Sequence, residues 1–401
     1  MRPPVIEAIE IENYRALQEV RIDKLKPFTV LVGPNGSGKS TLFDVFAFLA
    51  TCFTSGIRHA WDKRGGARQL HSRDSEGPIA IQISYREHPN KKRLTYRLEL
   101  DEQRGRPVVS RELLRWKRGD GPGRPSHILE FNNGTGYVVD EATGEKRKES
   151  LESPDRLAVN ALGQLKSHPR VTALLRFISG WYLSYLSVAE ERNSPAAGPQ
   201  ERLSQSGDNV SNVLQYLKEN HPDRLEVIME ALRETVPALE RVDYTTSPDG
   251  RLVLFIKDAP FREAVLANNA SDGTLKLLSY LTLLYDPDPA PFIGIEEPEN
   301  HLYPSVLHGL ADQCRQSSTR SQVLVTTHSY DFVNACKADE VIALYRDADG
   351  YTKVVRPNEL PLVKDMLEQG AQLGTLWQEN YFDNLPQPST PVTELRRAND
   401  A

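Results

Sequence analysis

The sequence has few cysteines and no long apolar run, and both absences narrow the classes of protein it can encode. Its only three cysteines, Cys52, Cys314 and Cys336, have neither CxxC nor metal-ligand spacing, which predicts buried free thiols in a reducing compartment. No apolar segment reaches the length that a membrane-spanning helix requires. Because the N-terminus runs directly into an alternating strand pattern over 5–11, we expect no signal peptide and a cytoplasmic location.

The chain also lacks an excess of positive charge, since its formal net charge is −6 over 401 residues. Proteins that bind nucleic acid usually carry a basic surface, so any such contact would depend on a local patch or on a partner protein. Hydrophobic residues make up 39% of the chain and charged residues 26%, which is ordinary for a soluble protein. The length allows a full α/β domain together with an inserted or second lobe.

One stretch matches a phosphate-binding loop at every defined position, Gly33-Pro34-Asn35-Gly36-Ser37-Gly38-Lys39-Ser40-Thr41. Its glycines let the backbone turn NH groups inward, and Lys39 supplies a positive charge for the β- and γ-phosphates. A buried strand over 28–32 enters the loop, and apolar residues at helical spacing over 42–49 follow it, so a helix N-terminus faces the phosphates. We predict that ATP contacts Asn35, Gly36, Ser37, Gly38, Lys39, Ser40 and Thr41, and that Ser40 also binds Mg²⁺.

Two later strand patterns also end in polar residues. The buried strand at 292–295 leads into Glu296 and Glu297; Glu296 is predicted to hold Mg²⁺, and Glu297 to orient and deprotonate the attacking water. Adjacent acids repel each other unless a metal or a proton offsets the cost, which favours this interpretation over a solvated turn. The strand at 322–327 ends at His328, which we expect to hydrogen-bond the γ-phosphate rather than to serve only as a structural residue.

A second helix start can also attract an anion. The run Ser271-Asp272-Gly273-Thr274 precedes a leucine-rich helix, whose N-terminus offers free NH groups and the positive end of the dipole. In a dimer, Ser271 and Gly273 of one chain would contact the γ-phosphate held by the other chain. An ordinary N-cap also explains Ser271, although not the whole run, and both interpretations stay open at this point.

Two further positions are candidates for contact with the nucleotide. Between the predicted strands at 5–13 and 18–25, Tyr14 and Arg15 can stack on the base or reach the phosphates, unless they form a solvated turn. In the basic loop that follows the helix, Gln69 is the nearest candidate for a glutamine that senses Mg²⁺ and the attacking water.

The remaining patterns predict the outline of the fold. We expect an antiparallel β-layer over 79–139, a loop or exposed helix over 140–165, a helix leading into a strand over 174–186, a flexible loop over 193–207, two amphipathic helices over 210–232, and hairpins over 241–256 and 341–355. The predicted division is an N-terminal ATPase lobe at 1–190, an inserted helical lobe at 191–240, a C-terminal ATPase lobe at 241–384 and a disordered tail at 385–401.

Taken together, the order of these motifs resembles the ABC-type ATPase head. Within that class the chain is similar to small prokaryotic ATPases related to RecF, SMC heads and the ATPase part of OLD-family nucleases, on the basis of Ile9-Glu10-Ile11-Glu12-Asn13-Tyr14-Arg15, Arg64-Gly65-Gly66 and Ile295-Glu296-Glu297-Pro298-Glu299-Asn300-His301-Leu302-Tyr303-Pro304. The resemblance implies an α/β P-loop NTPase fold with an antiparallel β-layer and an inserted helical lobe. It also implies two ATP molecules sandwiched in a homodimer that hydrolysis opens.

The resemblance assigns roles to matching residues. It makes Lys39 and Ser40 ligands of phosphate and Mg²⁺, Glu296 the acid on the Mg²⁺ side, Glu297 the catalytic base, His328 the switch, and Ser271 and Gly273 contacts to the γ-phosphate in trans. Three features depart from the family pattern: Glu296 replaces the commoner Asp, Asp272-Gly273-Thr274 replaces Gly-Gly-Gln, and no glutamine loop can be assigned. The long coiled coil of SMC proteins is absent, and too few residues follow His328 for the nuclease domain of OLD proteins.

Our leading hypothesis is a cytoplasmic ATPase that dimerises on ATP and regulates an effector, in anti-phage defence or DNA maintenance. The expected effector is a nuclease or toxin encoded nearby, with nucleic acid as a further candidate partner and no membrane contact. One alternative is the nucleotide-binding subunit of a membrane transporter, against which the extra lobes and the missing glutamine loop argue. The other alternative is an ATP-gated scaffold with negligible turnover.

Overall fold

The central sheet carries the phosphate loop. The computed structural model describes residues 3–116 and 126–382, so the tail predicted from 385 lies outside the described residues. In this part of the chain the central sheet has the order β10-β14-β15-β3-β16-β17, with all neighbours parallel except β16 and β17. Its strands are β3 (Phe28–Val32), β10 (Tyr182–Ser184), β14 (Phe292–Glu296), β15 (Gln322–Thr326), β16 (Val341–Arg346) and β17 (Thr352–Val355).

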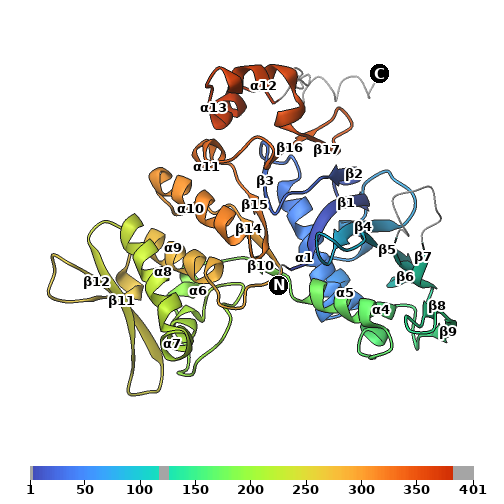
Figure 1. Ribbon diagram of the computed structural model, residues 1–401, viewed down its shortest axis with the longest axis horizontal. Coiled ribbons are helices and arrows are strands. Elements are labelled where there is room, and N and C mark those ends of the chain that lie inside the picture. The colour runs from blue at the N-terminus through green and yellow to red at the C-terminus, as the bar shows by residue number, and fades with distance from the viewer. Residues whose placement is uncertain (1–2, 117–125, 383–401) are drawn as a thin grey trace.

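Burial explains why these strands read as continuous apolar runs. Every residue of β3 and of β15 is buried, as expected for parallel strands that are covered on both faces. The two neighbours of β3 are β15 and β16, which come from the C-terminal part of the chain (Figure 1). The strands predicted at 28–32, 292–295 and 322–327 are therefore confirmed.

A separate antiparallel layer has the order β2-β1-β4-β5-β6-β7-β8-β9, which confirms the predicted layer and extends it at both ends. The stretch at 140–165 was expected to form a loop or an exposed helix, but it contains β9 and only a short helix, α4. All five residues of β9 are exposed, so its charged side chains face solvent while its backbone pairs with β8, and charge patterning could not reveal it. The strands are β1 (Val5–Tyr14), β2 (Leu17–Asp23), β4 (Ile79–Arg86), β5 (Leu94–Gln103), β6 (Arg106–Trp116), β7 (Ser126–Asn132), β8 (Thr135–Val139) and β9 (Lys146–Ser150).

Helix α1 (Lys39–Thr54) packs between the two sheets. On one side its Phe46 ring stacks on Phe292 of β14, with ring centroids 4.9 Å apart. On the other side its Phe48 ring packs on Tyr14 of β1, with centroids 5.6 Å apart. Because the helix is covered on two sides, its apolar residues extend around most of its circumference, which fixes the helix that leaves the phosphate loop.

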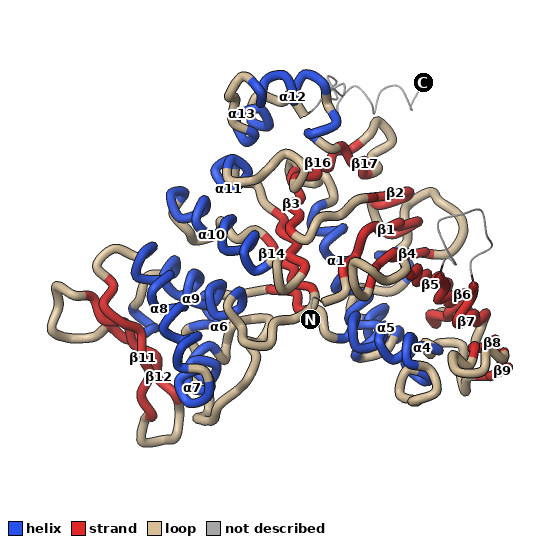
Figure 2. Tube along the Cα trace, in the orientation of Figure 1, coloured by secondary structure: helices blue, strands red, loops and turns tan. Residues whose placement is uncertain are grey.

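A helical lobe covers the opposite face of the central sheet. Figure 2 shows its helices on one side of the hairpin β11–β12, between this hairpin and the central strands, and on the far side of the central strands from the antiparallel layer; β13 completes the three-stranded sheet β11-β12-β13. The two predicted helices and the predicted hairpin are confirmed and share one core cluster with α9. These elements are α7 (Val210–Asn220), α8 (Pro222–Thr235), α9 (Asp272–Leu284), α10 (Pro304–Ser317), β11 (Leu239–Thr246), β12 (Leu252–Asp258) and β13 (Val265–Leu266).

Short helices complete the described chain. The helix and strand expected over 174–186 are confirmed as α5 and β10, and no helix or strand interrupts the predicted loop at 193–207. The four-part domain division remains a prediction. The remaining helices are α2 (Ile57–Asp62), α3 (Ala67–Leu70), α4 (Ala158–Leu162), α5 (Pro169–Ser179), α6 (Val188–Glu191), α11 (Tyr330–Asn334), α12 (Pro361–Glu368), α13 (Leu373–Gln378), η1 (Ala267–Asn269) and η2 (Pro357–Glu359).

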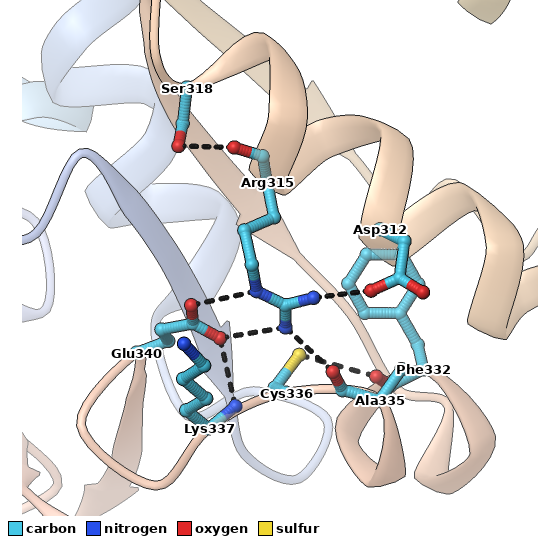
Figure 3. A network of polar contacts seen from close by, with 8 residues as sticks. All are labelled: Asp312, Arg315, Ser318, Phe332, Ala335, Cys336, Lys337 and Glu340. Atoms are coloured by element: carbon cyan, nitrogen blue, oxygen red, sulfur yellow. Dashed lines mark hydrogen bonds and ion pairs between the residues drawn. The ribbon is translucent and has the colours of Figure 1, made fainter.

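A guanidinium joins α10 to the chain that leads into β16 (Figure 3). Arg315 donates from Nε and Nη2 to the two carboxylate oxygens of Glu340, each at 2.9 Å, and from Nη2 to the carbonyl oxygen of Ala335 at 2.6 Å. It also pairs with Asp312 at 2.5 Å and lies over the Phe28 ring, 5.4 Å from its centroid. The bidentate geometry holds α10 against the end of α11 and the start of β16, beside the entry of β3.

A buried carboxyl anchors the antiparallel layer to α4. Glu112 of β6 is fully buried and accepts hydrogen bonds from the backbone NH groups of Ala158 (2.5 Å) and Val159 (3.1 Å) and from the Tyr96 hydroxyl (3.0 Å). Burial raises the pKa of this carboxyl to about 7, although its hydrogen bonds pull the pKa the other way. Glu112 therefore serves as the N-terminal cap of α4 in the absence of a local capping residue.

The raised pKa of Glu112 makes stability depend on pH. Because the folded-state pKa lies above the unfolded value of about 4.3, this group's contribution is complete below pH ~4 and is lost as pH rises to about 7. Urea unfolding of wild type and of Glu112→Gln from pH 4.5 to 8 measures this effect. We expect the free energy of unfolding of wild type to fall by up to about 3 kcal/mol relative to that of the variant by pH 7, with no further change above pH 7. If the free energies of unfolding of wild type and Glu112→Gln changed with pH in parallel, this assignment would be wrong. Glu149→Gln, on the exposed strand β9, is the control, and its free energy of unfolding should change with pH in parallel with that of wild type.

Candidate functional site

The predicted phosphate loop wraps the N-terminus of α1. Ser37, Gly38 and Lys39 are buried, Asn35, Gly36 and Ser40 are exposed, and Thr41 is intermediate. Gly38 has φ 106° and lies so close to β17 that a Cβ would come within 2.3 Å of Thr352 Oγ1, so only glycine fits. Lys39 Nζ donates to the carbonyl oxygens of Gly33 (2.8 Å) and Pro34 (3.2 Å), which holds the loop closed around its own lysine.

The hairpin β16–β17 supports the loop from behind. Thr352 Oγ1 donates to the carbonyl oxygen of Ser37 at 2.8 Å, and Arg346 Nε donates to that of Gly36 at 2.6 Å. Thr352 and Arg346 are more than 300 residues from the phosphate loop in the sequence, and the sequence pattern over 341–355 indicates only a hairpin. Sequence reasoning therefore missed both supporting residues.

Parallel pairing brings the acidic strand end to the same edge of the sheet as the loop. Glu297 has φ 46°, and its backbone NH donates to the carbonyl oxygen of Thr326 at 2.9 Å. Its carboxylate oxygen Oε1 lies 3.3 Å from His328 Nε2, while Oε2 accepts a hydrogen bond from Asn300 at 3.1 Å. The predicted base and the predicted switch residue are thus in contact.

The same acids act on Lys39. Burial lowers the pKa of its ammonium group to about 8, while the negative charges of Glu297, Glu299 and Glu296, in that order of size, oppose the shift. Three carboxylates from the end of β14 therefore lie within electrostatic reach of the buried ammonium. The phosphate loop and the acidic strand end therefore lie together in the fold, while the roles predicted for their residues remain predictions.

Glu299 is a site residue whose role was not predicted from the sequence. Its Oε2 accepts a hydrogen bond from Thr327 Oγ1 at 2.8 Å, and its Oε1 accepts one from the backbone NH of His328 at 2.5 Å. The carboxylate therefore holds the turn that carries His328. The sequence shows Glu299 only as the third acid in the run around Pro298, and this pattern does not distinguish its role from the roles of Glu296 and Glu297.

The donor set is suited to Mg²⁺. In residues 3–116 and 126–382, no group of three or more His, Cys, Asp or Glu side chains is arranged to hold a metal ion by itself. Mg²⁺ retains most of its waters and commonly takes one or two protein ligands beside substrate phosphates. The exposed hydroxyl-bearing Ser40 and the half-buried Glu296 fit that requirement.

The run at 271–274 does not act as a simple cap. Ser271 is exposed, and its side chain makes no capping hydrogen bond to α9. The carboxylate of Asp272 instead pairs with Arg192 at 2.5 Å and with His301 at 3.5 Å. A Cβ at Gly273 would lie 2.9 Å from the carbonyl oxygen of His301, so this glycine permits close approach of the loop that follows Glu297.

Helices α1 and α9 pack on opposite faces of the central sheet (Figure 1). Leu31 of β3 belongs to the core around α1, whereas Val30 and Val32 belong to the core around α9. The two anion-seeking helix starts of one chain are therefore separated by the sheet.

The turn at 13–15 is partly different from expectation. Tyr14 is fully buried and donates its hydroxyl to Asp44 at 2.7 Å, so the expectation that its ring can reach the nucleotide was wrong. Turning an apolar ring with a polar tip inward buries the ring while satisfying the hydroxyl, which the sequence pattern cannot distinguish from exposure. Arg15 stays half-buried and pairs with the same Asp44 at 2.9 Å.

Gln69 follows no strand of the central sheet and lies exposed on the four-residue helix α3. The strand beside β14 is β10, in which Ser184 pairs with Ile295, and Tyr185 comes next along the chain. Tyr185 is 45% exposed, and its partial burial raises the pKa of its hydroxyl to about 12, helped by the charges of Asp44 and Glu296. A tyrosine rather than a glutamine therefore follows the strand end next to the predicted Mg²⁺ acid.

Residues 28–334 match the family model described as "AAA domain, putative AbiEii toxin, Type IV TA system". That span runs from β3 to α11 and contains the loop, the start of α9, the acidic strand end and His328. None of the helices in the described chain is long and apolar enough to cross a membrane.

The chain also resembles two archaeal proteins named chromosome partition protein Smc. It is 25% identical over 229 residues to that of Pyrococcus furiosus, which covers 56% of this chain and 18% of that protein. It is 43% identical over 44 residues to that of Methanocaldococcus jannaschii, covering 11% and 4% of the two chains. The chain thus spans less than a fifth of the length of these relatives.

Solved structures give the fold. An Smc head bound to the C-winged helix domain of ScpA aligns with a TM-score of 0.55 at 16% identity, over 87% of this chain and 97% of that chain. An Smc head domain with an extended coiled coil, bound to the C-terminal domain of ScpA derived from Pyrococcus furiosus, aligns with a TM-score of 0.50 at 15% identity, over 91% and 99%. The predicted fold class is confirmed: the chain belongs to the AAA-domain family described above and has the P-loop ATPase fold of an Smc head.

Proposed function

We propose that this protein binds ATP with Mg²⁺, hydrolyses it, dimerises in the ATP-bound state and thereby regulates an effector. The observation that carries the proposal is the meeting of three strand ends around Lys39: the loop after β3, the acids after β14 and His328 after β15. Such convergence of phosphate-binding and acidic groups at the carboxyl edge of a parallel sheet is what phosphoryl transfer to water requires.

In this mechanism the loop binds the phosphates and the acids act on the water. Lys39 exchanges the carbonyl oxygens of Gly33 and Pro34 for oxygens of the β- and γ-phosphates. Ser40 and Glu296 would hold Mg²⁺, which would supply positive charge beside the phosphates. Glu297 accepts a proton from the attacking water.

His328 and Glu299 keep that base in place. The imidazole of His328 lies 3.3 Å from Glu297 Oε1 and can orient the carboxylate or donate to a γ-phosphate oxygen. Glu299 fixes the backbone of His328 through its NH group. One hydrogen-bonded turn therefore positions both the proton acceptor, Glu297, and its neighbour, His328.

The exposed N-terminus of α9 supports a composite site in a dimer. The Ser271 side chain is exposed and unused by its own helix, which is what a contact to another chain's γ-phosphate requires. The separation of α1 and α9 by the central sheet favours contact between chains over contact within one.

The comparisons support control of a partner. The family description names a toxin of a type IV toxin–antitoxin system, and the similar Smc heads are each bound to a domain of ScpA. We propose by analogy that ATP-driven association of two heads presents or releases an effector protein, in anti-phage defence or DNA maintenance.

Replacement of the proposed base tests hydrolysis. We expect Glu297→Gln to lower kcat by about 100-fold or more, because the amide cannot accept the proton, while ATP affinity changes little. Phosphate release measures turnover, and light scattering after gel filtration measures dimers, which should accumulate with ATP. Glu152→Gln, on an exposed side chain in the segment between β9 and α4, is the control. Unchanged turnover in Glu297→Gln would refute the assignment, and ATP-dependent dimers without wild-type turnover would select the scaffold alternative.

Mixing two inactive variants tests the composite site. Lys39→Ala removes phosphate binding, and Ser271→Arg blocks the contact that we assign to the partner chain. In a 1:1 mixture half of the dimers are mixed, and each mixed dimer has one fully wild-type site, so turnover should recover to about a quarter of wild type. A mixture that stays as inactive as the separate variants would exclude a site shared in this way.

The lowered pKa of Lys39 predicts a pH dependence of binding. Phosphate charge favours the protonated ammonium, so the complex takes up a proton wherever the free lysine has lost one. We expect the Kd for ATP to rise by up to about tenfold per pH unit above pH ~8, where the terminal phosphate is already ionised. Calorimetry from pH 7 to 9.5 measures this change. Lys39→Arg keeps its charge throughout and should lack the rise; a flat wild-type profile would contradict the prediction.

A further inference from the structure

A second charged cluster lies one helical turn beyond Ser40. Asp44 follows Ser40 by four residues on α1, so the two side chains project from the same face of the helix. Its Oδ2 accepts a hydrogen bond from the Tyr14 hydroxyl at 2.7 Å and pairs with Arg15 Nη1 at 2.9 Å. Its Oδ1 pairs with Arg64 through Nη2 at 2.7 Å and Nε at 2.8 Å.

The three residues that donate to Asp44 differ in how much of their side chains is exposed to solvent. The Arg64 side chain is 9% exposed, also donates to the carbonyl oxygen of Ala60 at 3.2 Å and lies over the Phe48 ring. Tyr14 is fully buried. Arg15 is 33% exposed, so of the three donors it alone turns a substantial part of its side chain toward solvent.

Arg64 and Tyr14 therefore fix the carboxylate, and the carboxylate fixes Arg15. Burial is the largest single effect on the pKa of the Arg64 guanidinium and would lower it, but the hydrogen bond to Asp44 and the nearby negative charges together raise this pKa, so the guanidinium stays charged. Two guanidinium groups and one carboxylate leave one net positive charge beside the phosphate loop. Arg15 retains free NH donors for an anion after its bond to Asp44.

We propose that Asp44 is a positioning residue that holds the Arg15 guanidinium ready for the phosphates of ATP. The backbone of Arg15 is already constrained, since it has φ 50° and its NH donates to the carbonyl oxygen of Leu70 at 2.7 Å. Restraining the end of a long side chain before binding removes an entropic cost that the nucleotide would otherwise bear. This inference rests on the proposed binding of ATP.

A double-mutant cycle tests the assignment. Calorimetric titration with ATPγS and Mg²⁺ gives the Kd for wild type, Asp44→Asn, Arg15→Ala and the double variant. We expect Asp44→Asn to raise Kd by about tenfold in the wild-type background and by less than about twofold when Arg15 is already alanine. A purely structural role would give the same factor in both backgrounds, and that result would overturn the proposal.

Glu130→Gln is the matched control. The Glu130 side chain has the same exposed fraction as Asp44, 20%, and likewise receives an arginine, Arg111, and a tyrosine, Tyr137, but it lies on β7 in the antiparallel layer. The Kd of Glu130→Gln for ATPγS should equal that of wild type. If wild type itself fails to bind ATPγS, the proposed function fails as well; if wild type binds and the cycle is additive, only the role of Asp44 fails.

A milder variant covers the case in which Asp44→Asn does not fold around the buried Arg64. Tyr14→Phe removes one hydrogen bond to Oδ2 and leaves all charges in place. The same cycle with Arg15→Ala should again show an increase in Kd that disappears in the double variant, with melting temperatures confirming that each protein is folded. Equal increases in both backgrounds would overturn the proposal.

Discussion

The burial of one positive charge organises the candidate site. Lys39 is 4% exposed, and an ammonium so far removed from water is unfavourable unless nearby groups compensate it. Two loop carbonyl oxygens and three carboxylates at the end of β14 supply that compensation. They can do so only because β14, β15 and β3 are parallel neighbours whose carboxyl ends meet at one edge. The order of strands, the sequence of the loop and the acidic run are thus parts of one electrostatic arrangement.

The parts of this arrangement that are local in sequence could be predicted. A strand that enters a glycine-rich loop and a helix that leaves it specify Lys39 within about twenty residues, and Glu297 and His328 each follow their own apolar strand. The family resemblance then supplied the fold class. Tyr14 and β9 show where local patterns fail: a tyrosine suits a buried or an exposed place equally well, and an exposed edge strand carries the charges of a loop.

The supporting residues could not be predicted, because their partners are distant in sequence or are indistinguishable among similar neighbours. Thr352 and Arg346 contact the phosphate loop across more than 300 positions. Glu299 is the third acid in a run, and only its hydrogen bond to the backbone of His328 separates it from the other two. Asp44 is the single acidic residue of α1, and the three donors that contact it come from two other segments.

The position of β3 has a consequence for synthesis of the chain. Phe28 pairs with Val323, which emerges from the ribosome 295 residues later (323 − 28), and the other neighbour, β16, begins later still. At roughly 5–20 residues per second, the strand that carries the phosphate loop therefore waits for roughly 15 to 60 s without either neighbour of its sheet. During that interval its apolar residues and unpaired backbone groups are available to other chains, so the strand that carries the phosphate loop is also one that is exposed to mispairing while the chain is made.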